Sequence, residues 1–173
     1  MSKVIALGVS DVTSLFVDKV SIKWPNDIYV GEKKIAGILI ENSIMGSVLG
    51  SSIAGIGFNV NQEQFHSDAP NPVSLTQLTG VIYEIDELLG VLLGAIDKWY
   101  NLLKEGAIDL IDNVYMERLY QLGTKKKYED ETGIFEGMIL GVNEIGQLQI
   151  KTTEGEIRTY HFKEVAFISD NAF

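Results

Sequence analysis

The sequence predicts an α+β protein, with helices and strands intermixed over residues 1–123 and a small all-β domain over residues 124–173. Three observations predict this fold class. Apolar residues recur at helical spacing in several segments before Gly123, and the shorter segments between them alternate as strands do. After Gly123 the helical spacing ends, and short strands separated by turn residues follow. A chain of 173 residues is also long enough for one medium domain and a small second one.

The first third of the chain is expected to form a helix followed by strands. Residues 3–17 carry apolar side chains near the helical period, which predicts a helix. Pro25, Asn26 and Asp27 predict a turn, because proline fixes φ and the Asn or Asp side chain bonds to nearby backbone groups. Strands are expected on both sides of this turn and beyond it, at residues 20–24, 28–30, 34–41 and 48–60.

The middle of the chain is expected to form a loop followed by helices. Residues 61–74 are rich in Asn, Asp and Pro, which predicts an irregular loop. Ser74 is a suitable N-cap for a short helix that Gly80 would end. Longer helices are expected at residues 86–104, which carry a broad apolar stripe, and at residues 108–121.

The last part of the chain has the rhythm of a small antiparallel barrel. Turn residues separate short apolar segments, and the total length suits a domain of the size of an SH3 domain. The domain boundary is therefore expected at residues 122–124. Strands are expected at residues 125–129, 134–142, 147–153, 156–162 and 165–168.

Composition excludes several classes of function. The net charge is −10, and an acidic surface argues against nucleic acid as a partner, because affinity there comes mainly from Lys and Arg. No apolar run reaches the roughly 18–20 residues that span a bilayer, so no membrane partner is expected. The absence of cysteine suits a cytoplasmic protein. His66 and His161 lack neighbouring ligands, so no protein metal centre is predicted.

Residues 23–41 are the stretch most informative about function. Lysines and an Asn-Asp pair lie there among residues that otherwise read as buried strand, and packing does not require them. Such a set suits the activation of a carboxylic acid by joining it to AMP, because cations are then needed where charge develops on the α-phosphate. Lys23, Lys33 and Lys34 are the candidate cations. Strand alternation places Lys33 and Lys34 on opposite faces, so one of them is expected to point into the site.

Two motifs of this sequence resemble those of the biotin protein ligases. Residues 23–27 read Lys-Trp-Pro-Asn-Asp and are followed at residues 34–39 by Lys-Ile-Ala-Gly-Ile-Leu. Residues 55–61, Gly-Ile-Gly-Phe-Asn-Val-Asn, are similar to a strand end of the same ligases. With the small C-terminal domain also in place, the resemblance covers the whole chain. It implies the C-terminal portion of a class II synthetase-like catalytic domain, with a mixed sheet, over residues 1–123 and an SH3-like barrel over residues 124–173.

The resemblance also implies a role for individual residues. Lys34 and Lys23 would be catalytic, with Lys34 contacting both biotin and the adenylate phosphate. Asn26, Asp27 and Asn59 would bind the nucleotide, with Asn26 and Asp27 on the metal side. The glycine-rich strands would line the biotin pocket, through Gly37, Ile38, Leu39, Gly55 and Gly57.

The function that the resemblance implies is ATP-dependent attachment of biotin to a lysine of a biotin carboxyl carrier protein, through biotinyl-5'-AMP and with Mg²⁺ accompanying ATP. The family carries an arginine-rich loop upstream of these residues that this sequence does not show. The chain is therefore expected to be weak or inactive alone, and to self-associate as a homodimer or pair with a complementing N-terminal segment. Two alternatives stay open, a non-catalytic carrier-binding module and a lipoate or octanoyl transferase on the same scaffold.

Overall fold

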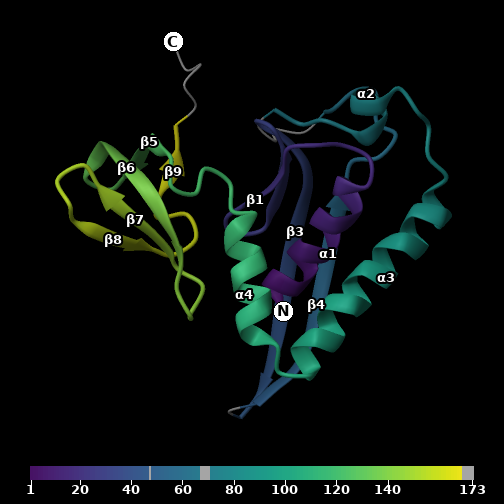
Figure 1. Cartoon of the computed structure of the whole chain (residues 1–173), viewed down its shortest axis with the longest axis horizontal. Coiled ribbons are helices and arrows are strands. Elements are labelled where there is room, and N and C mark those ends of the chain that lie inside the picture. The colour runs from purple at the N-terminus through teal and green to yellow at the C-terminus, as the bar shows by residue number, and fades with distance from the viewer. Residues whose placement is uncertain (47, 67–70, 169–173) are drawn as a thin grey trace. The chain divides into compact units, whose positions relative to one another are not determined.

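The computed structural model describes residues 1–46, 48–66 and 71–168. It divides into two compact units, Met1–Arg118 and Leu119–Phe173, called unit 1 and unit 2 below (Figure 1). The division falls after Arg118, slightly before the predicted boundary at residues 122–124. Parts of the loop expected at residues 61–74 and of the strand domain expected at residues 124–173 lie outside the described residues.

Unit 1 is an α+β unit built on a four-stranded sheet in the order β1-β2-β3-β4. Its elements are α1 (Ser2–Ser14), β1 (Val20–Lys23), β2 (Asp27–Val30), β3 (Lys33–Met45), β4 (Val48–Phe58), α2 (Leu75–Thr79), α3 (Ile85–Lys104) and α4 (Ile108–Glu117). Successive strands are joined by tight connections, so every pair of named strands is antiparallel. The mixed sheet that the resemblance implied is therefore not found among the described strands.

Several elements differ in length from those expected; the first helix, for example, ends at Ser14 and not at residue 17. The strand predicted at residues 34–41 extends to Met45, because β3 and β4 stay paired along a long hairpin. The helix predicted at residues 108–121 ends at Glu117. The carbonyl of Arg118 accepts a 2.7 Å hydrogen bond from the backbone N–H of Ile22 in β1. This hydrogen bond to β1 takes the chain out of the helix after Glu117. The apolar spacing of the sequence does not show it, because the partner lies far away in the chain.

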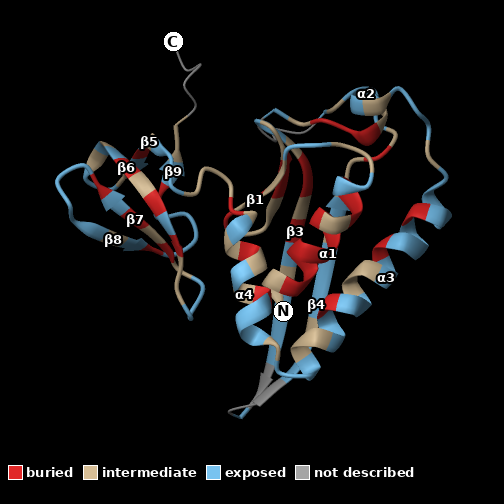
Figure 2. Ribbon diagram, viewed as in Figure 1, coloured by how far each residue is buried: buried red, intermediate tan, exposed pale blue. Residues whose placement is uncertain are grey.

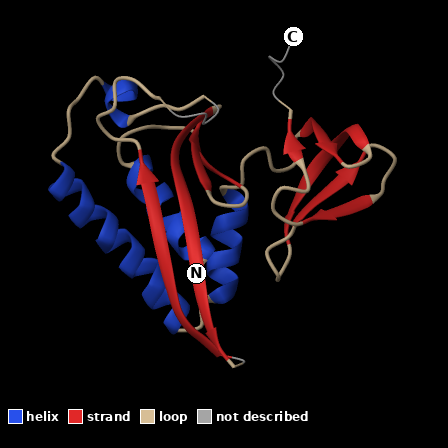
Figure 3. Ribbon diagram, turned by 180° about the vertical axis from the view of Figure 1, so that it is seen from behind, coloured by secondary structure: helices blue, strands red, loops and turns tan. Residues whose placement is uncertain are grey.

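The three longer helices lie on one side of the sheet and leave its other side uncovered in the described part of unit 1 (Figure 3). The core lies between these layers, where α1 is buried over most of its length and meets α3, α4 and the strands (Figure 2). Ile22, Ile28 and Ala36 supply the strand side of the core and are fully buried. Burial of such side chains stabilises the unit by about 1.5–3 kcal/mol for each large aliphatic residue.

The helix α1 approaches α3 closely at Gly8. A Cβ atom at this position would lie 2.7 Å from Cγ1 of Ile96 and 3.1 Å from its Cα. The first distance is shorter than carbon atoms tolerate and the second is tight, so a larger residue at position 8 would force α3 or the Ile96 side chain to move. None of the helices in the described ranges is both long and apolar enough to cross a membrane.

The short helix α2 confirms the predicted capping pattern. The hydroxyl of Ser74 accepts a hydrogen bond from the backbone N–H of Gln77, and the Gln77 side chain accepts one from the Ser74 N–H. Gly80 ends the helix in the left-handed conformation. Asn61 fixes the segment that follows, because its side chain pairs with both the N–H and the carbonyl of Tyr83.

Unit 2 contains a five-stranded antiparallel sheet in the order β8-β7-β6-β5-β9. Its strands are β5 (Lys125–Asp130), β6 (Gly133–Val142), β7 (Leu148–Thr152), β8 (Ile157–Tyr160) and β9 (Ala166–Phe167). Tyr128, Ile139, Leu148 and Ile150 form its buried centre. Among the described residues no pairing joins β8 to β9, so the sheet is open rather than a closed barrel.

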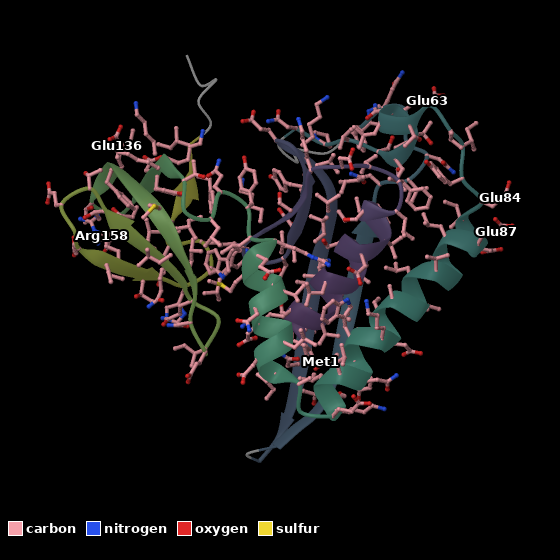
Figure 4. The ribbon with its side chains drawn as sticks, in the orientation of Figure 1. Met1, Glu63, Glu84, Glu87, Glu136 and Arg158 are labelled. Atoms are coloured by element: carbon pink, nitrogen blue, oxygen red, sulfur yellow. The ribbon has the colours of Figure 1, made fainter. Side chains whose placement is uncertain are left out.

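A buried carboxylate links two parts of this sheet. Asp130, at the end of β5, accepts hydrogen bonds from Tyr160 Oη at 2.7 Å and from Arg158 Nη1 at 3.0 Å, both on β8. Its other oxygen accepts from the hydroxyl and the backbone N–H of Thr132. Arg158, marked in Figure 4, also lies over the ring of Phe135. Burial alone would raise the pKa of Asp130, but these hydrogen bonds lower it to about 2.

We expect unit 2 to become less stable in acid, because Asp130 becomes protonated there. The pKa of Asp130 is lower in the folded than in the unfolded chain. The stabilisation that ionised Asp130 gives is therefore complete above its unfolded pKa of about 4 and is lost as the pH falls through its folded pKa of about 2. An Asp130→Asn variant should be less stable at pH 7 and should change less between pH 4 and pH 2. Hydrogen exchange of the Ile150 and Tyr160 amides would measure this, and an unchanged acid profile in the variant would contradict it.

Candidate functional site

The predicted site residues come together through the register of the sheet. Lys23 pairs with Asp27 across the β1–β2 hairpin, Asp27 pairs with Gly37 on β3, and Gly37 pairs with Gly57 on β4. Directly paired residues project to the same side of a sheet, so these positions form one cross-strand row. The neighbouring row holds Ile22, Ile28 and Ala36 and is buried beneath the helices. The row that begins with Lys23 therefore lies on the opposite side, which the helices do not cover and which is called the open face below (Figure 3).

A β-bulge brings Lys34 to the same side as this row. The register between β2 and β3 shifts between Ile28 and Tyr29, so that Ile28 pairs with Ala36 but Tyr29 pairs with Lys34. In a regular strand, Lys34 and Gly37 would point to opposite faces because they are three positions apart. The extra residue that the bulge adds to β3 shifts the alternation by one position, so Lys34 and Gly37 both point to the open face.

Lys34 and Asp27 form an ion pair on the open face. The distance from Lys34 Nζ to Asp27 Oδ1 is 2.7 Å, and the two side chains are 23% and 31% exposed. Gly37 makes room for the pair: a Cβ atom there would lie 3.1 Å from Cε and 3.2 Å from Nζ of Lys34. A larger residue at Gly37 would displace the lysine, so the glycine fixes where the ammonium group can lie.

Lys23 occupies the adjacent position, against Tyr29. Its Nζ lies 4.8 Å from the centre of the Tyr29 ring and 3.4 Å from the Tyr29 hydroxyl. Burial lowers the pKa of Lys23, the charge of Asp27 opposes this shift, and the charge of Lys34 adds to it. Lys23, Asp27, Tyr29 and Lys34 are called the lysine cluster below. The cluster places two cations and one carboxylate side by side, which gives a net positive charge suited to an anion.

The glycines predicted to line a biotin pocket lie next to the lysine cluster. Gly55 and Gly57 are exposed on the open face, and a Cβ atom at either would meet only a carbonyl oxygen on β3 at 3.9 or 3.8 Å. Packing within the described residues therefore does not require glycine at these positions. Leu39, the strand partner of Gly55, is 66% exposed on the same face. Together they form a smooth, partly apolar strip where a flat ring system can contact the backbone.

The other predicted site residues, Ile38, Asn26 and Asn59, do not belong to the cross-strand row that begins with Lys23. Ile38 is buried on the helix side of the sheet, so it does not share a face with Leu39. Asn26 lies in the turn, where its side chain accepts a hydrogen bond from the Ser2 hydroxyl and its carbonyl accepts from the Ile38 N–H. Asn59 follows β4 and is held through its backbone, which bonds to Ile35 and Leu75.

Sequence reasoning missed two features of this site. The sequence predicts Tyr29 only as a strand residue, although a short hairpin with Lys23 opposite Asp27 places residues 27 and 29 on the lysine's face. The ion pair of Asp27 with Lys34 was missed as well. It depends on the bulge in β3, and the residues there carry no signal for a bulge.

A hollow lies on the helix side of the sheet, away from the lysine cluster. This cavity of about 480 Å³ lies between the end of β4 and the first half of α3, and its walls include Ile56, Phe58, Leu88 and Leu92. Ile85 and Leu89 also line the cavity, and both are exposed, as is Leu93 on the same helix. The cavity is mostly apolar and lies apart from the charged groups of the open face.

Comparison with known proteins gives consistent matches over most of the chain. Residues 11–59 match the sequence profile of the Biotin/lipoate A/B protein ligase family. The bifunctional ligase/repressor BirA of Bacillus subtilis is 30% identical over 158 residues, which are 88% of this chain and 47% of the relative. The biotin–[acetyl-CoA-carboxylase] ligase of Paracoccus denitrificans is 29% identical over 90% of this chain and 68% of its own length. The chain thus spans about half the length of the Bacillus relative.

Solved structures agree with the sequence matches. The apo structure of the biotin protein ligase from Aquifex aeolicus has a TM-score of 0.77 and 30% identity, covering 96% of this chain and 73% of that chain. The same ligase solved in complex with biotin and ATP has a TM-score of 0.75 at 30% identity, over 95% of this chain and 69% of that chain. At this identity and coverage, the likeness extends to sequence as well as fold.

Proposed function

Because the chain belongs to the biotin protein ligase family, we propose that it takes part in the ATP-dependent attachment of biotin to a lysine of a biotin carboxyl carrier protein. In the first step an oxygen of the biotin carboxylate attacks the α-phosphorus of ATP, which gives biotinyl-5'-AMP and pyrophosphate. In the second step the carrier lysine, as a neutral amine, attacks the acyl carbon, and AMP leaves.

The observation that carries this proposal is the lysine cluster beside the glycine strip on the open face. Lys34 and Lys23 would stabilise the negative charge that develops on the α-phosphate, because an ammonium group donates strong hydrogen bonds to phosphate oxygens. Gly37, Gly55, Gly57 and Leu39 would contact the ring system of biotin, because they leave the backbone accessible on the same face.

The nucleotide is assigned to the neighbouring polar positions. Asn26, Asp27 and Asn59 would hold the adenylate, and Ile38 would support the biotin strip from the core side. Mg²⁺ would accompany ATP and neutralise the pyrophosphate. A carboxylate is a suitable Mg²⁺ ligand, and Asp27 is the carboxylate of the cluster.

The parts of the chain around the site would complete the catalytic protein. Residues 1–123 would form a portion of the catalytic domain and residues 124–173 an SH3-like domain. The apolar surface around the helix-side cavity would be covered by a complementing N-terminal segment or by a second copy. The absence of cysteine supports a cytoplasmic location for the reaction.

Biotin transfer to a carrier domain, measured with ATP and Mg²⁺, tests the proposal. The 173-residue chain would be assayed alone and with the N-terminal part of the Aquifex aeolicus ligase added in trans, with biotin-dependent exchange of ATP and pyrophosphate as a second readout. We expect exchange and transfer in the supplemented reaction and little in the chain alone.

Lipoate in place of biotin is the matched control, because the family profile that matches residues 11–59 covers ligases for both acids. A preference for lipoate would reassign the substrate. Carrier binding without exchange or transfer in either reaction would instead indicate a non-catalytic carrier-binding module.

A further inference from the structure

The two lysines of the cluster are held by partners of different chemistry. Lys34 is ion-paired with the carboxylate of Asp27 at 2.7 Å, whereas Lys23 lies over the face of the Tyr29 ring at 4.8 Å. A carboxylate holds an ammonium through its opposite charge. An aromatic face holds an ammonium through its quadrupole, at a position set by the ring.

Tyr29 is well suited to fix the position of a neighbouring group. It is only 4% exposed, and its strand partners Ser21 on β1 and Lys34 on β3 hold its backbone on both sides. Its ring is thus a rigid surface, while the Lys23 side chain has several rotatable bonds and needs an external contact to define where its ammonium group lies.

The contact between Lys23 and Tyr29 lies on the same face of the sheet as the glycine strip. Lys23 begins the row that continues through Asp27 and Gly37 to Gly57, and this row leads to the glycine strip. An ammonium held over Tyr29 therefore stays on the open face, where an anion bound beside the strip would meet it. The Tyr29 hydroxyl, 3.4 Å from Lys23 Nζ, adds a weak polar contact to the same ammonium group.

We propose that Tyr29 is a positioning residue that holds the Lys23 ammonium on the open face for the phosphate of an acyl-adenylate. This inference rests on the proposed function for the identity of the anion. The contact between Lys23 and Tyr29 does not depend on that function and can be tested separately. Tyr29 does not touch the reacting atoms; it acts through Lys23.

Competitive labelling with acetic anhydride at a fixed pH, read by mass spectrometry, tests the contact. In Tyr29→Leu the ring is lost, and we expect Lys23 to be acetylated about threefold faster relative to Lys33, since the ammonium form and its location are no longer stabilised. Tyr29→Phe keeps the ring and should stay near the wild-type rate. Unchanged Lys23 labelling in Tyr29→Leu would overturn the inference.

Binding of a phosphonate analogue of biotinyl-5'-AMP, measured by calorimetry beside binding of biotin alone, tests the role. Tyr29→Leu should weaken the analogue roughly tenfold and biotin little, and Tyr29→Phe should restore most of the loss. In a Lys23→Ala background the tyrosine change should have no further effect. A further tenfold loss in that background would show a merely structural role and overturn the inference.

The pair of Tyr100 and Lys104 on α3 is the matched control, since Lys104 Nζ lies 5.2 Å from the Tyr100 ring centre. Tyr100→Leu should alter labelling of Lys104 and leave analogue binding unchanged. If the wild-type chain, with the N-terminal segment supplied, fails to bind the analogue while labelling of Lys23 responds as expected, the proposed function fails and the contact stands. If the wild type binds and labelling does not respond, the inference about Tyr29 fails alone.

Discussion

Asp11→Ala is expected to lower the free energy of unfolding of unit 1 by about 2–4 kcal/mol, because it removes one carboxylate that joins three helices. Asp11 lies on α1 and accepts a 2.6 Å hydrogen bond from Arg118 Nη1, next to the end of α4. It also accepts one from the indole nitrogen of Trp99 on α3 at 2.8 Å, and Lys98 lies at 3.4 Å. The Asp11 and Arg118 side chains are 21% and 30% exposed, so the alanine variant leaves a half-buried guanidinium without its carboxylate.

Urea unfolding followed by tryptophan fluorescence measures this loss, because both tryptophans, Trp24 and Trp99, belong to unit 1. Asp18→Ala is the matched control: this carboxylate is exposed, and its loss should change the stability by no more than about 0.5 kcal/mol. Equal effects of the two substitutions would show that the Asp11 contacts do not stabilise the unit.

The same carboxylate gives unit 1 a dependence on pH. Burial alone would raise the pKa of Asp11, but hydrogen bonds from Arg118 and Trp99 more than offset burial, and the pKa lies below its usual value. The stabilisation is therefore complete above the unfolded pKa of about 3.9 and is lost as the pH falls through the lower folded value. In Asp11→Asn this acid-dependent loss of stability should disappear. Urea unfolding followed by tryptophan fluorescence at a series of pH values would show it.

Lys34→Ala is expected to lower kcat/KM for biotin transfer by about 100-fold or more, since it removes a cation from the site of developing charge. The assay is the supplemented reaction described above, and binding of the acyl-adenylate analogue should weaken in parallel. The fold should be little affected. The ion pair with Asp27 lies on the open face, and such pairs contribute about 1 kcal/mol or less.

Lys33→Ala supplies the control for Lys34. It removes the same charge one residue away, on an exposed side chain paired with Val30, and should leave transfer near the wild-type rate. A loss of thermal stability in Lys34→Ala that matches its loss of activity would assign Lys34 to the fold. Equal losses in Lys33→Ala and Lys34→Ala would point to net charge rather than to the lysine cluster.

The amino-acid sequence was sufficient to locate most elements of this chain. Local features determine them: the apolar spacing of α1 and α3, the capping residues Ser74 and Gly80, and the turn residues between the strands of unit 2. The α+β fold class follows from these elements, and the motifs at residues 23–27, 34–39 and 55–61 were enough to predict the family.

The tertiary structure alone decided which side chains share a face and which partners hold them. The bulge in β3 turns Lys34 towards Asp27 and Gly37, and the packing of the helices on one side of the sheet decides that Ile38 is buried and Leu39 exposed. The contact of Tyr29 with Lys23 and the early end of α4 at Glu117 likewise depend on contacts with other strands. Capping and periodicity act over a few neighbouring residues and so can be read locally. Register, bulges and ion pairs are set by the free energy of many contacts between distant segments, which appear only once the chain is folded.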